Sequence, residues 1–358
     1  MPYISKPDET PVVEFSEKQR AEFEREVAKT WGAVDVVCRR LGGEVLSCSD
    51  EWFGEAARLV HESAPVREAG RFTEAGAWYD GWETRRHNPA PYDWAIIKMG
   101  VYSARIVGCE VDTAYFDGNH APYISVDALS AEAGAPVEED DPRWVEVVPR
   151  VECGPSRRHF FLRSEPTEGT FTHVKLKMYP DGGIARFRLY GQVIPVPASG
   201  PYGTSHQDGS FTINLAGVHQ GAVALQVSDQ HFGNVENLLL PGRGHDMSDG
   251  WETKRSREPG HSDWAIIRLA RRSHYVSRIV VDTIHFRGNF PQYVMVHGIC
   301  KDTAPEHDDP GWQLLVDRSA TGPDKEHEYP VDKFIFLTHV KLTIIPDGGV
   351  KRLCVWGY

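Results

Sequence analysis

Hydrophobic and polar positions alternate with a period of two in several short runs of the chain. In residues 174–178 apolar side chains alternate with lysines, and residues 185–189 repeat this pattern after the turn sequence Pro-Asp-Gly-Gly. Such alternation around turn residues is typical of a β-hairpin with one buried face. Residues 94–97 and 106–111 are further short runs rich in β-branched side chains. The pattern therefore predicts short strands.

Four blocks of sequence occur twice in the chain, in the same order. The two copies are separated by 166–170 residues, and 25 of the 33 positions in the blocks are identical. Long blocks at a nearly constant offset indicate the duplication of a whole domain rather than a solenoid of short repeats. The blocks of the first copy are 80–86, 93–98, 111–119 and 173–183, and they return at 249–255, 263–268, 281–289 and 339–349.

The duplication divides the chain into four parts. Residues 1–30 are an N-terminal extension, of which 17–30 has helical composition and no counterpart in the second copy. We predict a first repeat at 31–195, a linker rich in Pro, Gly and Ser at 196–212, and a second repeat at 213–358. The predicted fold is all-β, with two tandem jelly-roll β-sandwich domains preceded by a short helical extension.

Composition and charge narrow the classes of function. The chain has 358 residues, and 51 acidic against 39 basic side chains give a formal charge of −12. Because no stripe of Lys and Arg is present, nucleic acid is not an expected partner. No run approaches the ~20 apolar residues of a membrane span, and the charged opening lacks the apolar core of a signal peptide. We therefore predict no membrane association and a cytoplasmic location.

The common sequence motifs for cofactors are missing. The six cysteines include no C-x-x-C pair, and we interpret them as reduced thiols rather than as a zinc site. The chain contains no Walker loop, no G-x-G-x-x-G and no G-x-S-x-G elbow. We therefore expect no metal, no organic cofactor and no serine nucleophile.

The repeated block Asp-Gly-Trp-Glu-Thr-(Arg/Lys)-Arg gathers two carboxylates and two cations around a turn. Glu83 and Glu252 have the chemistry to accept hydrogen bonds from N–H groups or to move a proton. Arg85, Arg86 and Arg255 have the geometry to bind a carboxylate through two hydrogen bonds. These residue types suit a small polar ligand.

A structural interpretation of the same block stays open. Asp80 and Asp249 are suited to Asx turns, the tryptophan rings to filling a core, and the ion pairs to holding the loop against its neighbour. Both interpretations place the block in a turn directly before the apolar run Asp-Trp-Ala-Ile-Ile.

Two histidines occupy the same strand position in the two copies. His173 and His339 each follow a threonine, and the alternation predicts that they lie on the polar face of the strand with Lys175 or Lys341. Each is a candidate general acid or base near pH 7. The alternative for both is a hydrogen-bonded structural histidine.

A third histidine belongs to the first copy alone. His120 follows Asn119 in a turn, whereas the second copy has Phe290 after Asn289. Any chemistry at this histidine is therefore confined to one copy. The copies could form one shared site, two sites, or one active and one inactive site. Because they are not chemically equivalent, we favour a single asymmetric site, to which both domains could contribute.

The repeated blocks resemble those of the allantoicase family. The resemblance is carried by residues 80–86 with 93–98, by residues 111–122 and by the second copies of these blocks, and it extends from about residue 41 to residue 358. It implies two tandem jelly rolls of the galactose-binding-like type, in agreement with the strand pattern. The activity that it implies is the hydrolysis of allantoate to ureidoglycolate and urea in purine catabolism.

The implied reaction requires an acid and a base. Both products keep an intact ureido group, so the bond that breaks joins the central carbon to a ureido nitrogen, as in the hydrolysis of an aminal. Glu83 or Glu252 and His173 or His339 are the expected acid and base. The residues expected to bind the substrate are Asp80, Arg85, Arg86, Asn119, His120, Asp249, Arg255 and Asn289.

Two other functions compete with this one. Jelly rolls of this type also serve as carbohydrate-binding modules, so a non-catalytic tandem protein that binds a carbohydrate or a ureide is the first alternative. A metal-assisted hydrolase is the second, although no ligand spacing favours a particular metal. Allantoate is the expected partner, and a homo-oligomer stays open.

Overall fold

The computed structural model describes residues 10–358 apart from 133, 196–202 and 206–210. The chain divides into two compact units, Met1–Ile194 and Pro195–Tyr358. Most of the expected linker, residues 196–212, lies outside the described residues. The parts of it that are described, 203–205 and 211–212, belong to two paired strands of the second unit.

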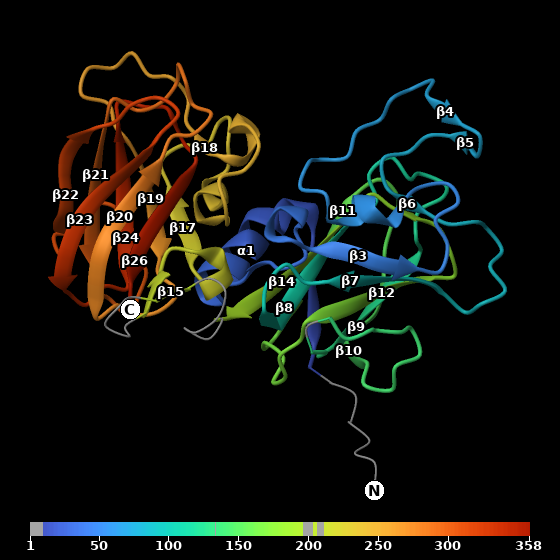
Figure 1. The fold of residues 1–358 in the computed structure, drawn as a ribbon. Helices are drawn as coiled ribbons and strands as arrows, with labels where there is room; N and C mark the ends of the chain where they lie inside the picture. The colour runs from blue at the N-terminus through green and yellow to red at the C-terminus, as the bar shows by residue number, and fades with distance from the viewer. Residues whose placement is uncertain (1–9, 133, 196–202, 206–210) are drawn as a thin grey trace, which may run out of the picture. The chain divides into compact units, whose positions relative to one another are not determined.

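The first unit contains two five-stranded antiparallel sheets (Figure 1). In order across the first sheet, the strands are β1 (Val12–Phe15), β11 (Arg158–Arg163), β8 (Ser103–Asp112), β14 (Arg186–Ile194) and β2 (Val34–Asp35). Across the second sheet they are β10 (Val145–Glu152), β9 (Tyr123–Leu129), β12 (His173–Tyr179), β7 (Asp93–Lys98) and β3 (Glu44–Cys48). Two small ribbons add β6 (Trp82–Glu83) with β13 (Gly183–Ile184) and β4 (Phe72–Thr73) with β5 (Gly76–Ala77).

The second unit repeats this arrangement. One sheet has the order β15 (Gly203–Ser205), β16 (Phe211–Asn214), β26 (Arg352–Gly357), β20 (Tyr275–Asp282) and β23 (Glu326–Phe334). The other has the order β17 (Val223–Val227), β19 (Asp263–Arg268), β24 (His339–Ile345), β21 (Tyr293–Ile299) and β22 (Gln313–Ala320). A ribbon of β18 (Trp251–Glu252) and β25 (Gly349–Val350) corresponds to β6 and β13.

Alternating side chains of the two sheets form the core of each unit. In the first unit, Val126 and Leu176 of one sheet and Val111 and Leu189 of the other are fully buried. Because successive residues of a strand point to opposite faces, the period of two in the sequence places these side chains between the sheets. The prediction of two tandem β-sandwich domains is confirmed.

The predicted β-hairpin of residues 174–179 and 185–189 is wrong. The first segment is β12, which pairs with β7 and β9, whereas the second belongs to β14 and pairs with β8 in the opposite sheet. The Pro-Asp-Gly-Gly turn and the short strand β13 carry the chain from one sheet to the other. Alternation shows that a strand has one buried face, and both strands bury that face in the same core, so the pattern does not specify pairing.

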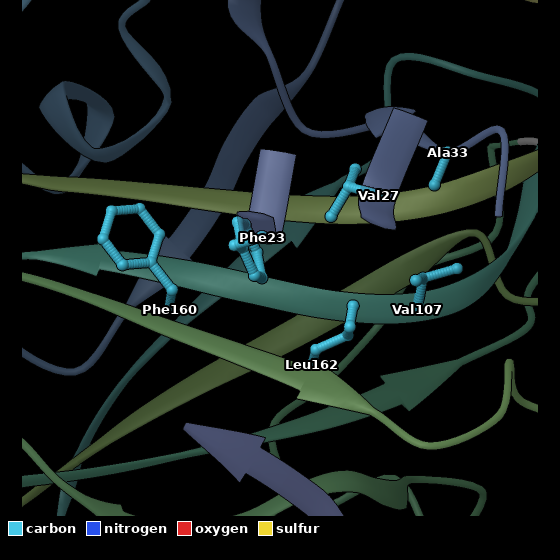
Figure 2. Close-up of a cluster of buried hydrophobic side chains, with 6 residues drawn as sticks. All are labelled: Phe23, Val27, Ala33, Val107, Phe160 and Leu162. Atoms are coloured by element: carbon cyan, nitrogen blue, oxygen red, sulfur yellow. The ribbon is translucent and has the colours of Figure 1, made fainter. Parts of the chain in front are cut away.

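The N-terminal extension is helical, as predicted, and packs on the first domain. It contains β1, which pairs with β11, the short helix α1 (Arg20–Arg25) and helical turns at Glu17–Gln19 and Glu26–Thr30. Phe23 and Val27 lie against Val107, Phe160 and Leu162 of the sheet (Figure 2). In the described part of the chain no helix is long and apolar enough to cross a membrane.

Phe23 is the central contact of this extension. Its ring is fully buried, with its centroid 5.2 Å from that of Phe160 and 5.4 Å from that of Tyr190. We expect Phe23→Ala to lower the free energy of unfolding of the first domain by about 3–5 kcal/mol, as urea denaturation measures, because it leaves a cavity. Phe72→Ala, at a side chain that is 72% exposed, is the control and should change it by less than about 0.5 kcal/mol. Equal effects of the two substitutions would show that the extension does not stabilise the domain.

Candidate functional site

The loop that carries Glu83 is anchored by the tryptophan before it. Trp82 is fully buried, and its indole N–H donates to the backbone oxygen of Asp50 (2.8 Å). Gly81 lets the chain approach β13 closely, since a Cβ there would lie 2.7 Å from the Ile184 oxygen. These contacts fix the backbone of Glu83, which pairs with Gly183.

The carboxyl group of Glu83 is buried and held by an amide. Glu83 is 8% exposed, and Asn119 Nδ2 donates a hydrogen bond to Glu83 Oε1 at 2.6 Å. Burial raises the pKa of Glu83 above its ordinary value, although the Asn119 hydrogen bond and the charge of Arg86 oppose this. The group therefore keeps its proton to a higher pH than an exposed glutamate, which suits a general acid.

Arg86 lies beside this carboxyl group. Its Nη1 atom is 2.8 Å from Asp181 Oδ1, and its Nη2 atom donates to the Gly118 oxygen at 3.4 Å. The other oxygen of Asp181 accepts from the backbone N–H of His87 (2.9 Å). The side chain of Arg86 is 37% exposed, so it is both oriented and accessible.

His120 lies on the other side of Gly183 from Glu83. Gly183 pairs with Glu83 and also bridges to His120, which places the two backbones about 10 Å apart at the usual strand spacing. The ring of His120 is half-buried, and its Nδ1 atom has no hydrogen-bond partner among the described residues. Glu83 and His120 therefore flank Gly183, while Asn119 contacts Glu83 and Arg86 contacts Gly118 and Asp181.

The second domain reproduces only part of this cluster. Asn289 Nδ2 donates to Glu252 Oε1, as Asn119 does to Glu83, but Glu252 is less buried than Glu83. Arg255 is exposed, and no contact with Asp347, the counterpart of Asp181, is formed in the described structure. With Phe290 in place of His120, the second domain lacks the histidine as well.

Asp80 is occupied by partners from the protein. Arg186 Nη2 donates to its Oδ2 atom (2.7 Å), Arg58 Nη1 to its Oδ1 atom (3.2 Å), and the backbone N–H of Val66 also to Oδ2 (3.0 Å). Burial alone would raise the pKa of Asp80, but these hydrogen bonds outweigh it and lower the pKa. Groups of the protein therefore bind both carboxylate oxygens of Asp80, which was expected to bind the substrate.

Asp249 and Arg85 are likewise engaged. Asp249 forms ion pairs with Arg352, at 2.8 Å, and with Lys351. Arg85 is 65% exposed and contacts Asp50 through its Nε atom (3.0 Å) and its Nη2 atom (2.9 Å). Asp80 and Asp249 thus hold their loops to the sheet through ion pairs, whereas the structural interpretation assigned them to Asx turns.

The structure separates His173 from Glu83. His173 begins β12, and the turn that contacts Arg86 follows the other end of this seven-residue strand, roughly 20 Å away at the usual rise per residue. His173 is 7% exposed rather than on an open polar face, and its Nδ1 atom is 2.8 Å from Thr172 Oγ1. Burial, with Lys98, lowers its pKa.

His339 has the same environment in the second domain. It is 3% exposed, and its Nδ1 atom is 2.8 Å from Thr338 Oγ1. Within each domain, the predicted pair of a glutamate with a histidine is therefore not brought together. The pattern could not reveal this, because it gives the face of a strand on which a residue lies and not its distance from a loop at the opposite end.

A polar pocket of about 410 Å³ lies next to Arg85 and Arg86. Its wall also contains Asp50, Asn88 and Asp93. Among the residues that the structure describes, no group of three or more His, Cys, Asp or Glu side chains is placed to hold a metal ion.

Comparison with known proteins gives the family of this chain. A family model described as the allantoicase repeat matches residues 34–194 and again 213–358. The chain belongs to the allantoicase family. The allantoicase of Saccharomyces cerevisiae is 58% identical over 348 residues, which cover 96% of this chain and 99% of the relative. An allantoicase of Neurospora crassa is 49% identical, with 90% of each chain covered.

A solved allantoicase has the same fold. The crystal structure of the Saccharomyces cerevisiae allantoicase superposes with a TM-score of 0.87 at 56% identity, and the match covers 97% of this chain and 100% of that chain. The expectation that the repeated blocks mark an allantoicase is confirmed.

Sequence reasoning missed two residues near Arg86. Asp181 orients Arg86, and the signal for it was the Pro-Asp-Gly-Gly turn that both copies contain. Asp93 lies in the wall of the pocket, and the signal for it was the repeated block that it begins.

The buried histidines predict a pH dependence of stability. Burial, with Arg268, lowers the pKa of His339 to about 4, whereas an unfolded histidine has a pKa near 6.5. The unfolded chain therefore takes up a proton first as the pH falls, and stability decreases from about pH 6.5 towards pH 4. We expect the free energy of unfolding to fall by about 2–3 kcal/mol more in the wild type than in His339→Gln between pH 7 and pH 4.5.

Urea denaturation at the two pH values measures this difference. His245→Gln, at an exposed position, is the control for the loss of a histidine. If the wild type and His339→Gln lose the same stability, His339 is not the group that takes up the proton.

Proposed function

We propose that this chain hydrolyses allantoate to ureidoglycolate and urea, and that the cluster around Glu83 in the first domain carries the reaction. The match to allantoicases along nearly the full length supports the reaction. The buried carboxyl group of Glu83, held by Asn119 and close to Arg86, supports the location.

The bond that breaks determines what the cluster must supply. Both products keep an intact ureido group, so the reaction cleaves the bond between the central carbon of allantoate and one ureido nitrogen. This nitrogen must receive a proton before it leaves as urea, because its anion is a poor leaving group. The lone pair of the other ureido nitrogen stabilises the positive charge that develops on carbon, as the ring oxygen does in glycoside cleavage.

Glu83 is the general acid in this proposal. Its raised pKa leaves it protonated at a higher pH than an ordinary glutamate, and Asn119 fixes the orientation of the carboxyl group. As the C–N bond breaks, Glu83 gives its proton to the departing nitrogen. The carboxylate that remains is stabilised by the Asn119 amide and by the charge of Arg86.

Arg86 and His120 complete the site. Arg86 is oriented by Asp181 and is accessible, so it binds the substrate carboxylate. His120 takes a proton from the water that attacks the carbon, in place of the more distant His173. Water supplies its hydroxyl group to carbon and its remaining proton to His120, and this proton then passes to Glu83, so the cycle ends with both groups in their initial states.

We also infer a reducing, cytoplasmic environment. All six cysteines are free thiols, including the buried pair Cys109 and Cys153. Free thiols are characteristic of compartments in which disulfides do not persist. Retention of the protein with a cytosolic marker after cell fractionation would support this location.

The two glutamates of the repeated block provide a matched comparison. We expect Glu83→Gln to lower kcat for urea release from allantoate by a factor of ~10²–10⁴, because the amide has no proton to give, while the melting temperature changes little. Glu252→Gln makes the same change in the second domain, and we expect less than a threefold effect. Equal losses in the two variants would contradict a site confined to the first domain.

His120 distinguishes the two copies further. His120→Phe introduces the side chain that the second copy has at this position, and we expect it to lower kcat by ~10²-fold or more through loss of the base. His173→Gln removes a buried histidine far from Glu83 and should leave kcat within about threefold. The rate of urea release measures both, and a greater loss in His173→Gln would restore the original assignment.

A further inference from the structure

The pocket beside Arg86 has a carboxylate at its wall that the proposed reaction does not use. Asp93 begins β7 and is 1% exposed. Its Oδ1 atom accepts hydrogen bonds from Ser49 Oγ (2.7 Å) and Asn88 Nδ2 (2.7 Å). Its Oδ2 atom is buried and has no hydrogen-bond partner among the described residues.

An unpaired buried carboxylate oxygen is unfavourable. Burial removes the oxygen from its hydrogen bonds with water, and the loss is not compensated unless another donor reaches it. Asp93 lines a pocket of about 410 Å³, which has the volume for a small molecule that carries a donor.

The second domain shows how the same aspartate is satisfied without a ligand. Asp263 accepts from Ser228 Oγ at 2.8 Å, as Asp93 does from Ser49. Its Oδ2 atom lies 3.2 Å from the Nε2 atom of His261. Two residues before Asp93 the first domain has Pro91, whose side chain has no donor. The difference leaves Asp93 Oδ2 without the partner that His261 gives to Asp263.

The lining of the pocket also includes two arginines. Arg86 makes two hydrogen bonds through its guanidinium, which has five N–H groups, so donors remain for a ligand. Arg85 also lines the pocket, although Asp50 binds it. The pocket therefore combines one acceptor for an N–H group with donors for an anion.

We infer that this pocket is the recognition site for a ureido group attached to a carboxylate. In this arrangement Asp93 Oδ2 accepts a hydrogen bond from a ureido N–H, and Arg86 binds the carboxylate of the same molecule. The inference rests on the proposed function and deepens it, because it gives the uncleaved ureido arm of the substrate a specific partner. Asp93 is then a specificity-determining residue, since a ligand without the N–H leaves its oxygen unpaired.

Asp93→Asn tests the acceptor. The amide keeps the shape of the side chain and an oxygen for Ser49 and Asn88, but it presents an N–H₂ group where Oδ2 was. We expect KM for allantoate to rise by about tenfold or more, with a smaller change in kcat. Asp263→Asn is the matched control in the second domain and should leave KM unchanged.

Pro91→His tests the comparison between the domains. It introduces the side chain that His261 provides in the second domain, so it should fill the acceptor of Asp93 and raise KM without lowering the melting temperature. If the role of Asp93 is merely structural, Pro91→His should leave KM for allantoate unchanged, because the added histidine would then not compete with a substrate group.

Binding of N-carbamoylglycine separates this inference from the proposed function. This compound has one ureido group and one carboxylate but no bond to cleave, and calorimetry with the full-length protein measures its affinity. We expect binding to the wild type that is weakened about tenfold in Asp93→Asn and in Pro91→His.

The outcomes are distinguishable. If the wild type releases urea from allantoate but KM and N-carbamoylglycine affinity are the same in Asp93→Asn, the pocket inference is overturned and the proposed function stands. If the wild type releases no urea, the proposed function fails, and the binding data decide the pocket by themselves. If the wild type does not bind N-carbamoylglycine, the pocket inference also fails.

Discussion

The ion pair between Asp80 and Arg186 holds the loop of Glu83 against the first sandwich. The aspartate ends the loop before Trp82, and the arginine begins β14, more than 100 residues later in the chain. Both are buried, so removing Asp80 would leave the charge of Arg186 uncompensated in the core. The position of Glu83 therefore depends on a long-range contact, and Asp249 with Arg352 repeats this contact in the second domain.

Comparison of the two copies distinguishes contacts that both sandwiches share from residues that differ between them. The Trp anchors, the Asp–Arg pairs and the Glu–Asn hydrogen bonds occur in both domains. Among the described residues, the first domain alone adds His120, the contact of Arg86 with Asp181 and the buried, unpaired oxygen of Asp93. These additions lie around one turn and the adjoining pocket, which is the pattern expected when one copy keeps a chemical task and the other keeps the framework.

The fold was predictable from the sequence, and the site only in part. The sequence predicts two sandwiches because the alternation of side chains is a local signal for strands, and because the repeated blocks occur twice and mark two domains. The pairing of β12 with β14 was mispredicted, because strands of opposite sheets bury the same core and share one pattern. The repeated Asp-Gly-Trp-Glu-Thr block led to Glu83 and Arg86. The distance of His173 from them depends on which end of β12 lies near the loop, and the alternation of side chains carries no information about this. Asp93 escaped notice because it is identical in both copies, and the informative difference is Pro91 against His261.

The pairing of β1 with β11 has a consequence for the edges of the two sheets. In the first domain β1 covers this edge with backbone hydrogen bonds, whereas β23 ends the corresponding sheet among the described residues of the second domain. An uncovered edge invites pairing with another chain and aggregation. β23 carries Glu326, Glu328 and Lys333, and it has Pro330, which lacks an N–H, at the position that corresponds to Leu162 beside β1. In the second domain, charged side chains and a proline on β23 thus take the place of the strand β1. Both features disfavour pairing of this edge with another molecule at high concentration.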